Sequence, residues 1–269
     1  MPNHVIAPAK VNLTLHVTGQ RSDGYHLLDS YVMFAGLGDS LTFAPGADIS
    51  LHVTGPYADG VPDDASNLVW RAAKAAGWTG RIDLVKNLPH GAGIGGGSAD
   101  AAAVLRALGD GGADALALGA DVPVCVQSKA SRMSGIGDHV RLVRHAFPFF
   151  AVLVNPGIHV ATPKVFKALS RKDNPAMSRM PDAQASGADW IDWLAQQRND
   201  LEGPACACAP EISSVLDALR GTENVLLARM SGSGATCFGL FPSSSDAQRA
   251  SDAVQAANPD WWCVHTVLS

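Results

Sequence analysis

The sequence carries little charge and no excess of basic residues. Charged residues make up 17% of its 269 positions, hydrophobic residues make up 47%, and the formal net charge is -5. A chain with this balance folds around a hydrophobic core rather than staying disordered. Because it lacks a broad basic surface, we expect no nucleic acid partner. A small anionic ligand is still compatible, since a local site can be positive on an acidic protein.

Cysteine is also scarce, and its five positions are scattered: Cys125, Cys206, Cys208, Cys237 and Cys263. An odd and dispersed set does not form the framework of a disulfide-rich protein, so we expect reduced thiols. Cys206 and Cys208 are spaced like half of a metal site. No second Cys or His pair at ligand spacing accompanies them, so ordinary buried thiols are the better interpretation.

Long apolar runs are missing as well. No uninterrupted apolar stretch approaches the roughly 20 residues that a bilayer-spanning helix needs. Residues 1–10 show no cationic segment followed by an apolar run, so we expect no signal peptide. The sequence therefore predicts a soluble, cytoplasmic protein with no membrane partner. It leaves both a monomer and a homodimer open.

The length is comfortable for two domains. A break near 146–148, where Pro148 precedes the apolar run 149–154, predicts domains at 1–147 and 148–269. Alternating apolar and polar residues predict strands at 5–18, 29–35, 40–44, 49–54 and 81–86. Residues 67–76 predict a helix with Asn67 as its N-cap and Gly77 as its end. The second half predicts helices at 162–170, 188–197, 210–220 and 245–257, with strands at 224–230, 235–241 and 261–267.

The most distinctive segment is a glycine-rich loop that runs into Ser98 and an alanine-rich helix ending at Gly109. Its five glycines are Gly91, Gly93, Gly95, Gly96 and Gly97. Glycine allows close backbone approach, so successive N–H groups and the helix amino end can surround a phosphate. The loop lacks the Lys of Walker A and the last glycine of a dinucleotide fingerprint. A flexible loop without a ligand is the alternative, but so many glycines cost folding entropy unless their conformation is used.

Two charged residues lie in apolar surroundings. Asp121 precedes the apolar run 122–126, where a carboxylate is costly without a partner or a task. From the residues alone, a general base and a helix cap are equally good interpretations. Lys10 lies in a predicted strand between Ala9 and Val11, where an exposed edge charge is the ordinary interpretation. Asn12, two residues on, lies on the same strand face.

Three segments, in order, resemble the GHMP kinases, the family named for galactokinase, homoserine kinase, mevalonate kinase and phosphomevalonate kinase. They are Pro8–Leu13, Pro89–Ala102 and Met230–Ala235. Four more narrow the resemblance to the branch that acts on a cytidine diphosphate-linked methylerythritol: Asp23–His26, Leu118–Pro123, Thr162–Phe166 and Asn199–Glu202. There are two departures. The stretch before Asp121 is short, and Asp138 stands where the family has Glu after Gly-Ile-Gly.

The resemblance implies an α/β (α+β) fold of two lobes, a ribosomal-protein-S5-like N-terminal domain and a ferredoxin-like C-terminal domain, with the active site between them. It implies transfer of the ATP γ-phosphoryl group to the 2-hydroxyl of the small-molecule substrate in non-mevalonate isoprenoid synthesis, with Mg²⁺ accompanying ATP. One alternative is another family member, such as homoserine kinase or mevalonate diphosphate decarboxylase. A non-catalytic nucleotide-binding protein is the other. The cytidine-type segments argue against the first, and the presence of both Lys10 and Asp121 argues against the second.

The resemblance also assigns roles to residues around the phosphate. Asp121 is then the base for the substrate hydroxyl, Lys10 is its partner, and Asn12 orients the same groups. Ser98 gives its hydroxyl to phosphate or to Mg²⁺, although it can also cap the helix. Asp100, placed in the first helical turn, complements the helix dipole. The phosphate loop comprises Pro89, Gly91, Gly93, Gly95, Gly96, Gly97 and Ser98.

A second group of residues is assigned to the nucleoside. Tyr25 and Phe166 resemble the aromatic pair that sandwiches the cytosine ring. His26 resembles the residue that reads the edge of the base, and Thr162 supports the same pocket. Each of these residues also has an ordinary interpretation as a core or surface side chain, so the roles depend on the resemblance.

Overall fold

Contacts divide the chain into two units whose segments interleave. The computed structural model describes residues 4–144 and 147–269. One unit contains the chain up to Lys10, residues 37–90 and residues 95–128; the other contains 11–36, 91–94 and the chain from Lys129 onward. Two strands, β1 (His4–Asn12) and β3 (His26–Pro45), belong to both units. The predicted boundary between 147 and 148 adjoins residues 145–146, which lie outside the described residues, and it stays a prediction.

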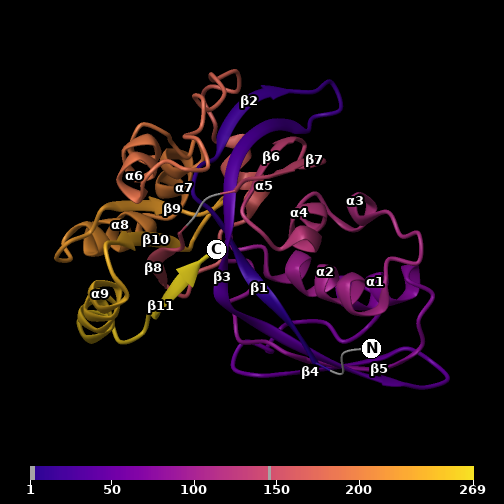
Figure 1. The fold of residues 1–269 in the computed structure, drawn as a ribbon. Helices are drawn as coiled ribbons and strands as arrows, with labels where there is room; N and C mark the ends of the chain where they lie inside the picture. The colour runs from indigo at the N-terminus through magenta and orange to yellow at the C-terminus, as the bar shows by residue number, and fades with distance from the viewer. Residues whose placement is uncertain (1–3, 145–146) are drawn as a thin grey trace. The chain divides into compact units, whose positions relative to one another are not determined.

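The first unit is a sheet with helices on one face (Figure 1). Within it, β5 (Gly80–Val85) pairs antiparallel with β3 and parallel with β4 (Ser50–Thr54). The helices are α1 (Leu68–Ala75), α2 (Gly96–Leu108), α3 (Ala115–Leu118) and α4 (Val122–Gln127). Asn67 caps α1 as predicted, its side chain accepting from the N–H of Val69. The small residues of α2 are mostly buried, which lets its neighbours pack closely.

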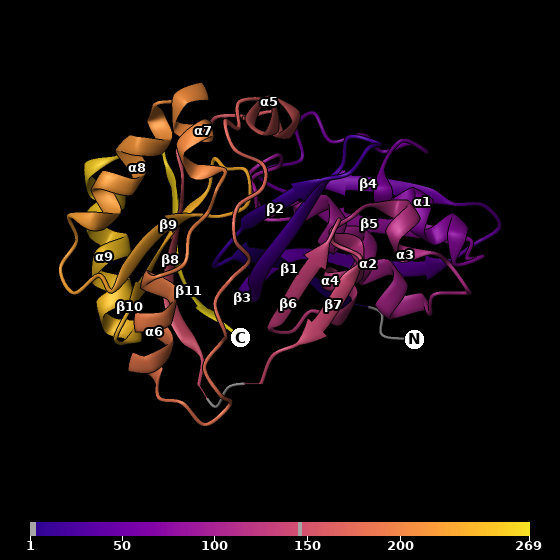
Figure 2. The same ribbon diagram turned by 90° about the horizontal axis from the view of Figure 1, so that it is seen from above.

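The second unit contains an antiparallel sheet in the order β11-β8-β10-β9. These strands are β8 (Phe149–Asn155), β9 (Leu227–Met230), β10 (Cys237–Phe241) and β11 (Trp262–Leu268). Two amphipathic helices, α8 (Glu211–Arg220) and α9 (Ser244–Ala257), pack against the sheet (Figure 2). The chain order strand, helix, two strands, helix, strand is that of a ferredoxin-like domain, as the sequence predicted.

The second unit also contains smaller elements outside this sheet. They are β2 (His16–Gln20), the hairpin of β6 (Ser131–Gly135) and β7 (His139–Leu142), and the helices α5 (Thr162–Lys167), α6 (Gly187–Ala195) and α7 (Glu202–Cys208). The single strand predicted over 5–18 is two strands. Between them, the N–H groups of Leu13 and Thr14 both donate to the carbonyl of Tyr31, which breaks the ladder.

All five cysteines are free thiols, and two are fully buried. Cys125 lies on α4 in the first unit and Cys237 on β10 in the second. Burial raises the pKa of the Cys125 thiol to about 12 and raises the pKa of Cys237 well above its ordinary value. Across 4–144 and 147–269, no His, Cys, Asp and Glu side chains form a group of three or more that could hold a metal ion. No helix within those ranges is long and apolar enough to cross a membrane.

Candidate active site

The structure brings Lys10 and Asp121 together within the first unit. The Lys10 ammonium lies 2.7 Å from Oδ1 of Asp121, and the two side chains are 5% and 36% exposed. Lys10 is therefore not an exposed edge charge. Asp121 stands at the N-cap position of α4, but its side chain makes no capping hydrogen bond. A carboxylate held by a buried ammonium and still open to solvent on one side can accept a proton from an approaching group.

The glycine loop enters α2 through Gly95. This residue is the N-cap of the helix and has φ 66° and ψ 20°, a left-handed conformation that glycine adopts without strain. A Cβ placed there would lie 3.2 Å from Cβ of Lys10. Ser98 is the third residue of the helix, and no side chain caps this helix end. The N–H groups at this end and the Ser98 hydroxyl are therefore not engaged in capping.

The first half of the loop is fastened to the Met230–Ala235 turn within the second unit. The Ser231 hydroxyl donates to the Gly93 carbonyl at 3.0 Å, and the N–H of Thr236 donates to the Ala92 carbonyl at 3.0 Å. A Cβ on Gly93 would lie only 2.6 Å from the Ser231 carbonyl oxygen. The two glycine-rich segments thus pack backbone against backbone. Pro89, just before this half of the loop, is buried.

Asn12 joins the same arrangement through its backbone. Its N–H donates to the Ser231 hydroxyl at 3.0 Å, and its side-chain NH₂ donates to the Ser30 hydroxyl at 2.8 Å. The Asn12 carbonyl oxygen Oδ1 is buried and has no hydrogen-bond partner among the described residues. A buried acceptor without a donor from the protein needs one from water or from a ligand.

The residues assigned to the nucleoside differ in their exposure and in their contacts. His26 stacks on Phe166, with ring centroids 4.6 Å apart and planes 26° apart. Tyr25 is 59% exposed at the β2–β3 turn and makes no ring contact within the described part of the chain. The Thr162 hydroxyl lies 2.8 Å from the Ser233 hydroxyl, which ties the start of α5 to the Met230–Ala235 turn.

His26 combines a lowered pKa with a ring nitrogen that has no partner among the described residues. Its Nε2 atom is buried and has no partner among the described residues. Burial, and then the charge of Lys172, lower the pKa of His26 below its ordinary value. The ring is therefore neutral at physiological pH and has one nitrogen to donate and one to accept.

The Asn199–Glu202 segment holds the Met230–Ala235 turn in place. The side-chain NH₂ of Asn199 donates to the carbonyls of Met230 and Gly232, at 2.8 and 2.9 Å. Glu202 accepts from the N–H of Met230 at 2.9 Å. Sequence comparison marked this segment as family-like but gave it no role, because the bonds run to residues about 30 positions away.

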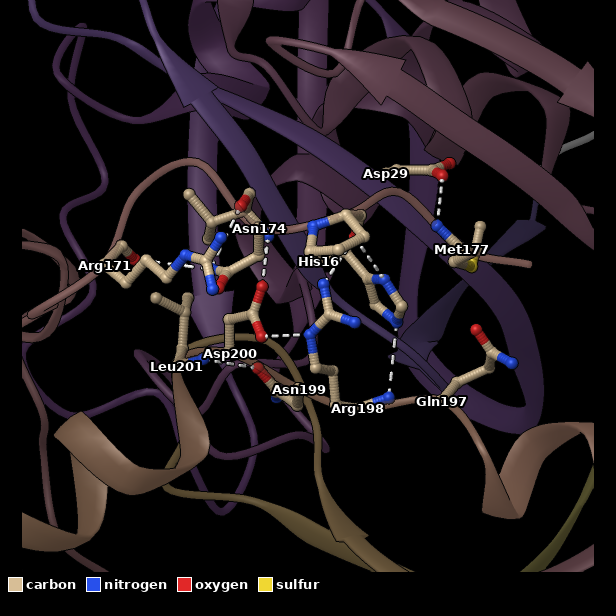
Figure 3. A network of polar contacts seen from close by, with 12 residues as sticks. His16, Asp29, Arg171, Asn174, Met177, Gln197, Arg198, Asn199, Asp200 and Leu201 are labelled. Atoms are coloured by element: carbon tan, nitrogen blue, oxygen red, sulfur yellow. Dashed lines mark hydrogen bonds and ion pairs between the residues drawn. The ribbon is translucent and has the colours of Figure 1, made fainter.

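A network around His16 fixes that segment (Figure 3). Asp200 accepts from the guanidinium of Arg198 and from the N–H of Val17, at 2.6 and 2.7 Å. The ring of His16 lies between the Pro175 carbonyl at Nδ1 and the N–H of Arg198 at Nε2. Burial, and then Arg198, lower the pKa of His16, so the neutral ring donates from Nδ1 and accepts at Nε2.

Sequence reasoning missed a buried charge cluster behind the helix. Lys86 pairs with Asp39 and, at 2.7 Å, with Asp100. Asp100 was predicted to complement the helix dipole from the first turn. That prediction is wrong, because the first turn of α2 contains no acidic residue and Asp100 is buried against Lys86. An Asp within a run of buried alanines was the signal that could have pointed to an ion pair.

Comparison with known proteins shows the family to which the chain belongs. The model of the GHMP kinases N terminal domain matches residues 67–141, and the model of the GHMP kinases C terminal domain matches residues 184–260. A homoserine kinase from Cytophaga hutchinsonii shares the fold, with a TM-score of 0.63 at 16% identity over 100% of this chain and 95% of that one. The fold and the site thus define the class of GHMP kinases.

Relatives of higher sequence identity narrow the family further. The 4-diphosphocytidyl-2-C-methyl-D-erythritol kinase of Dinoroseobacter shibae is 55% identical over 97% of this chain and 93% of that one, and its Paracoccus denitrificans counterpart is 54% identical over 100% and 98%. A crystal structure of 4-(cytidine 5'-diphospho)-2C-methyl-D-erythritol kinase has a TM-score of 0.76 at 34% identity, over 99% of both chains. The chain belongs to the family of 4-diphosphocytidyl-2-C-methyl-D-erythritol kinases.

Proposed function

We propose that this protein transfers the γ-phosphoryl group of ATP to the 2-hydroxyl of 4-diphosphocytidyl-2-C-methyl-D-erythritol, giving ADP and the 2-phosphate. The reaction serves non-mevalonate isoprenoid precursor synthesis in the cytoplasm. Family membership supports this function over that of another GHMP kinase or of a non-catalytic nucleotide-binding protein. The observation that carries the chemistry is the pairing of Lys10 with Asp121.

The pair supplies what an alcohol nucleophile requires. As the 2-hydroxyl oxygen attacks the γ-phosphorus, the bond from that phosphorus to the ADP oxygen breaks, and the hydroxyl proton passes to Asp121. Lys10 holds the Asp121 carboxylate at 2.7 Å and offsets negative charge on the transferring group. Because Asp121 makes no capping bond, protonating it costs the fold no hydrogen bond at α4.

The glycine loop and the start of α2 are proposed to hold the ATP phosphates. Uncapped N–H groups at a helix amino end attract anions, and the left-handed Gly95 turns the chain into that end. The Ser98 hydroxyl is a hard oxygen of the kind that suits Mg²⁺. Mg²⁺, when bound with ATP, neutralises polyphosphate charge. Asp100 does not suit the ion, because the Lys86 ammonium already occupies one of its oxygens.

The second unit is proposed to recognise the cytidine part of the substrate. The unpartnered Nε2 of His26 can take part in a hydrogen bond with the base edge, and Phe166 and Tyr25 offer aromatic surfaces for stacking. Asn12 offers its free Oδ1 as an acceptor. Thr162 supports the Met230–Ala235 turn through the contact of its hydroxyl with Ser233.

A coupled assay for ADP tests the proposal. Purified protein, ATP and Mg²⁺ are combined with the cytidine substrate, homoserine, mevalonate and mevalonate 5-diphosphate in turn, and phosphorus NMR locates the new phosphate. ADP is expected only with the cytidine substrate, together with a 2-phosphate signal. ADP from homoserine or a mevalonate, or from none of the four, would contradict the proposal.

A further inference from the structure

The side chain of Asn12 is hydrogen-bonded to Ser30, and both residues are buried in the second unit, at 2% and 0% exposure. The side-chain NH₂ of Asn12, at the end of β1, donates to the Ser30 hydroxyl on β3 at 2.8 Å. Ser30 in turn donates to the main-chain carbonyl of Thr14. The three groups therefore form a short chain of hydrogen bonds that ends at a carbonyl.

The carbonyl at the end of this chain determines its direction. A carbonyl oxygen can only accept, and a serine hydroxyl has one hydrogen, so Ser30 uses that hydrogen on Thr14. The Ser30 oxygen is then an acceptor toward Asn12. An amide turned the other way would place two oxygens against each other with no hydrogen between them. The network therefore directs the NH₂ of Asn12 toward Ser30 and its Oδ1 away from it.

Thr14 is itself fixed from two sides. It is fully buried, and its hydroxyl accepts from the N–H of Tyr31 at 2.8 Å and donates to the sulfur of Met177. The N–H of Met177 donates to Asp29 at 2.9 Å, which keeps that sulfur in place (Figure 3). The acceptor that orients Ser30 is therefore held by the residues around it.

The Oδ1 atom of Asn12 is the end of the chain that is open to a ligand. It is buried and receives no donor from the described residues, while the backbone N–H of Asn12 donates to Ser231. An acceptor of this kind suits a hydroxyl group, which can donate, and does not suit an ionised phosphate oxygen, which only accepts. Asn12 follows Lys10 by two positions on β1 and lies on the same strand face. The methylerythritol part of the proposed substrate carries hydroxyl groups.

Resting on the proposed function, we propose that Ser30 is a positioning residue that orients the Asn12 amide, so that Oδ1 accepts a hydrogen bond from a hydroxyl of the methylerythritol part of the substrate. Ser30 acts through Asn12. Without the Ser30 hydroxyl, the amide loses the acceptor that distinguishes its two ends, and it can present either NH₂ or Oδ1 to the ligand. The reversed amide offers the substrate a donor where it needs an acceptor.

Steady-state kinetics of Ser30→Ala test this role. KM for the cytidine substrate is expected to rise by about three- to tenfold, the scale of one hydrogen bond, while KM for ATP stays near the wild-type value. Ser131→Ala is the matched control, because Ser131 is a fully buried serine of β6 whose hydroxyl donates to the Lys129 carbonyl at 2.8 Å. It should leave both KM values unchanged. An unchanged substrate KM in Ser30→Ala, or an equal rise in both variants, would overturn the inference.

A double-mutant cycle separates positioning from direct contact. Asn12→Ala removes the amide on which Ser30 is proposed to act, so adding Ser30→Ala to it should lower kcat/KM by less than about twofold further. Effects that multiply would show that Ser30 acts independently of Asn12, and they would overturn the inference alone. Wild-type protein that produced no ADP with the cytidine substrate would overturn the proposed function, and the inference with it.

Nuclear magnetic resonance of the wild-type protein gives an answer even if Ser30→Ala does not fold. In protein containing isotope-labelled asparagine, the side-chain NH₂ signal of Asn12 is identified by its loss in Asn12→Ala. Its protons are expected to show a nuclear Overhauser contact to the β protons of Ser30 and to exchange slowly with solvent. Rapid exchange without that contact would mean that the NH₂ does not face Ser30, and would overturn the inference.

Discussion

Asp121 occupies the cap position of α4, yet its carboxylate is 2.7 Å from the ammonium of Lys10 and caps nothing. Another aspartate close by shows what a capping residue looks like in the same unit. Asp114, at the start of α3, accepts from the N–H of Leu116 at 2.9 Å. The comparison therefore excludes a capping role for the Asp121 side chain, and the role of base stays our proposal.

Asp121→Asn is expected to lower kcat by about 10²-fold or more, because the amide cannot accept the hydroxyl proton. ATP affinity should change little, and the unfolding transition should stay close to that of the wild type. Steady-state kinetics and calorimetry measure the two effects. Asp114→Asn, which alters a true cap, should keep kcat. Near-normal turnover by Asp121→Asn would show that the residue is structural.

Lys10→Met is expected to lower kcat on a similar scale, since it removes a positive charge beside the base and keeps the aliphatic stem. Lys74→Met provides the comparison, because Lys74 is exposed at the end of α1. Initial rates at saturating ATP and substrate show whether kcat has fallen. If only KM rose, Lys10 would contribute to uniform binding instead.

Gly95→Ala is expected to weaken ATP binding by about tenfold. Alanine at this position must keep the left-handed backbone conformation, which costs about 1–2 kcal/mol. Its Cβ would also lie 3.2 Å from Cβ of Lys10. Gly60→Ala is matched for backbone, with φ +73° but nothing within 4 Å of the Cβ position. It should lose stability and keep nucleotide affinity. Equal ATP dissociation constants for both variants would argue against the loop as the phosphate site.

Asn199→Asp is expected to lower the free energy of unfolding by about 2–5 kcal/mol. The substitution replaces two buried donors by an acceptor facing the carbonyls of Met230 and Gly232. Urea denaturation measures the change. Asn87→Ala, which removes an exposed amide bonded to one carbonyl, should cost less than about 1 kcal/mol. Similar losses for the two variants would mean that Asn199 does not hold the turn.

The cytidine substrate should be preferred over its uridine analogue, mainly in kcat/KM. Stacking holds both bases, so discrimination comes from hydrogen bonds, at about 1–3 kcal/mol for each buried group left unpaired. Phe166→Ala should lower kcat/KM for both substrates and keep the ratio between them. His26→Ala should bring the cytidine-to-uridine ratio of kcat/KM closer to one. Equal use of both substrates by the wild type would exclude a cytidine-reading pocket.

The pH dependence of substrate KM gives a separate test of His26. Its pKa is lowered by burial and then by Lys172, so the ring is neutral from neutral pH upward. Protonation turns the accepting nitrogen into a donor as pH falls below the ordinary histidine range near about 6.5. KM for the cytidine substrate should be flat above that range and rise below it. A flat KM in acid would remove His26 from base recognition.

Local patterns predicted the parts of the molecule that local physics determines. The glycine-to-alanine transition placed α2 and the Asn67 cap placed α1, whereas the ferredoxin-like order came from the family resemblance and agreed with the helices and strands predicted in the second half. Residues 29–35 and 40–44 were predicted as separate strands, but the structure has one strand, β3. Gly38 lies between them because a Cβ there would meet the Ala7 carbonyl, so this glycine permits a close strand contact rather than a turn.

The contacts between residues far apart in the sequence are the part of the site that sequence patterns could not predict. Lys86 lies 47 residues after Asp39 and 14 residues before Asp100, and no local period connects the three. The same holds for Asn199, whose partners lie 31 and 33 residues on. The resemblance located Lys10 and Asp121, but only the coordinates show that Asp121 pairs with Lys10 and makes no capping bond, because both interpretations use the same residue at the same position.

Each unit contains one buried thiol whose reactivity reports local opening of that unit. Cys125 lies in one unit and Cys237 in the other, and both stay protonated and covered while the fold is closed. Alkylating reagents attack only the exposed thiolate, so each labelling rate records how often its own neighbourhood opens. Mass spectrometry of labelled peptides, with and without nucleotide, would show which half of the enzyme a ligand protects, without any engineered probe.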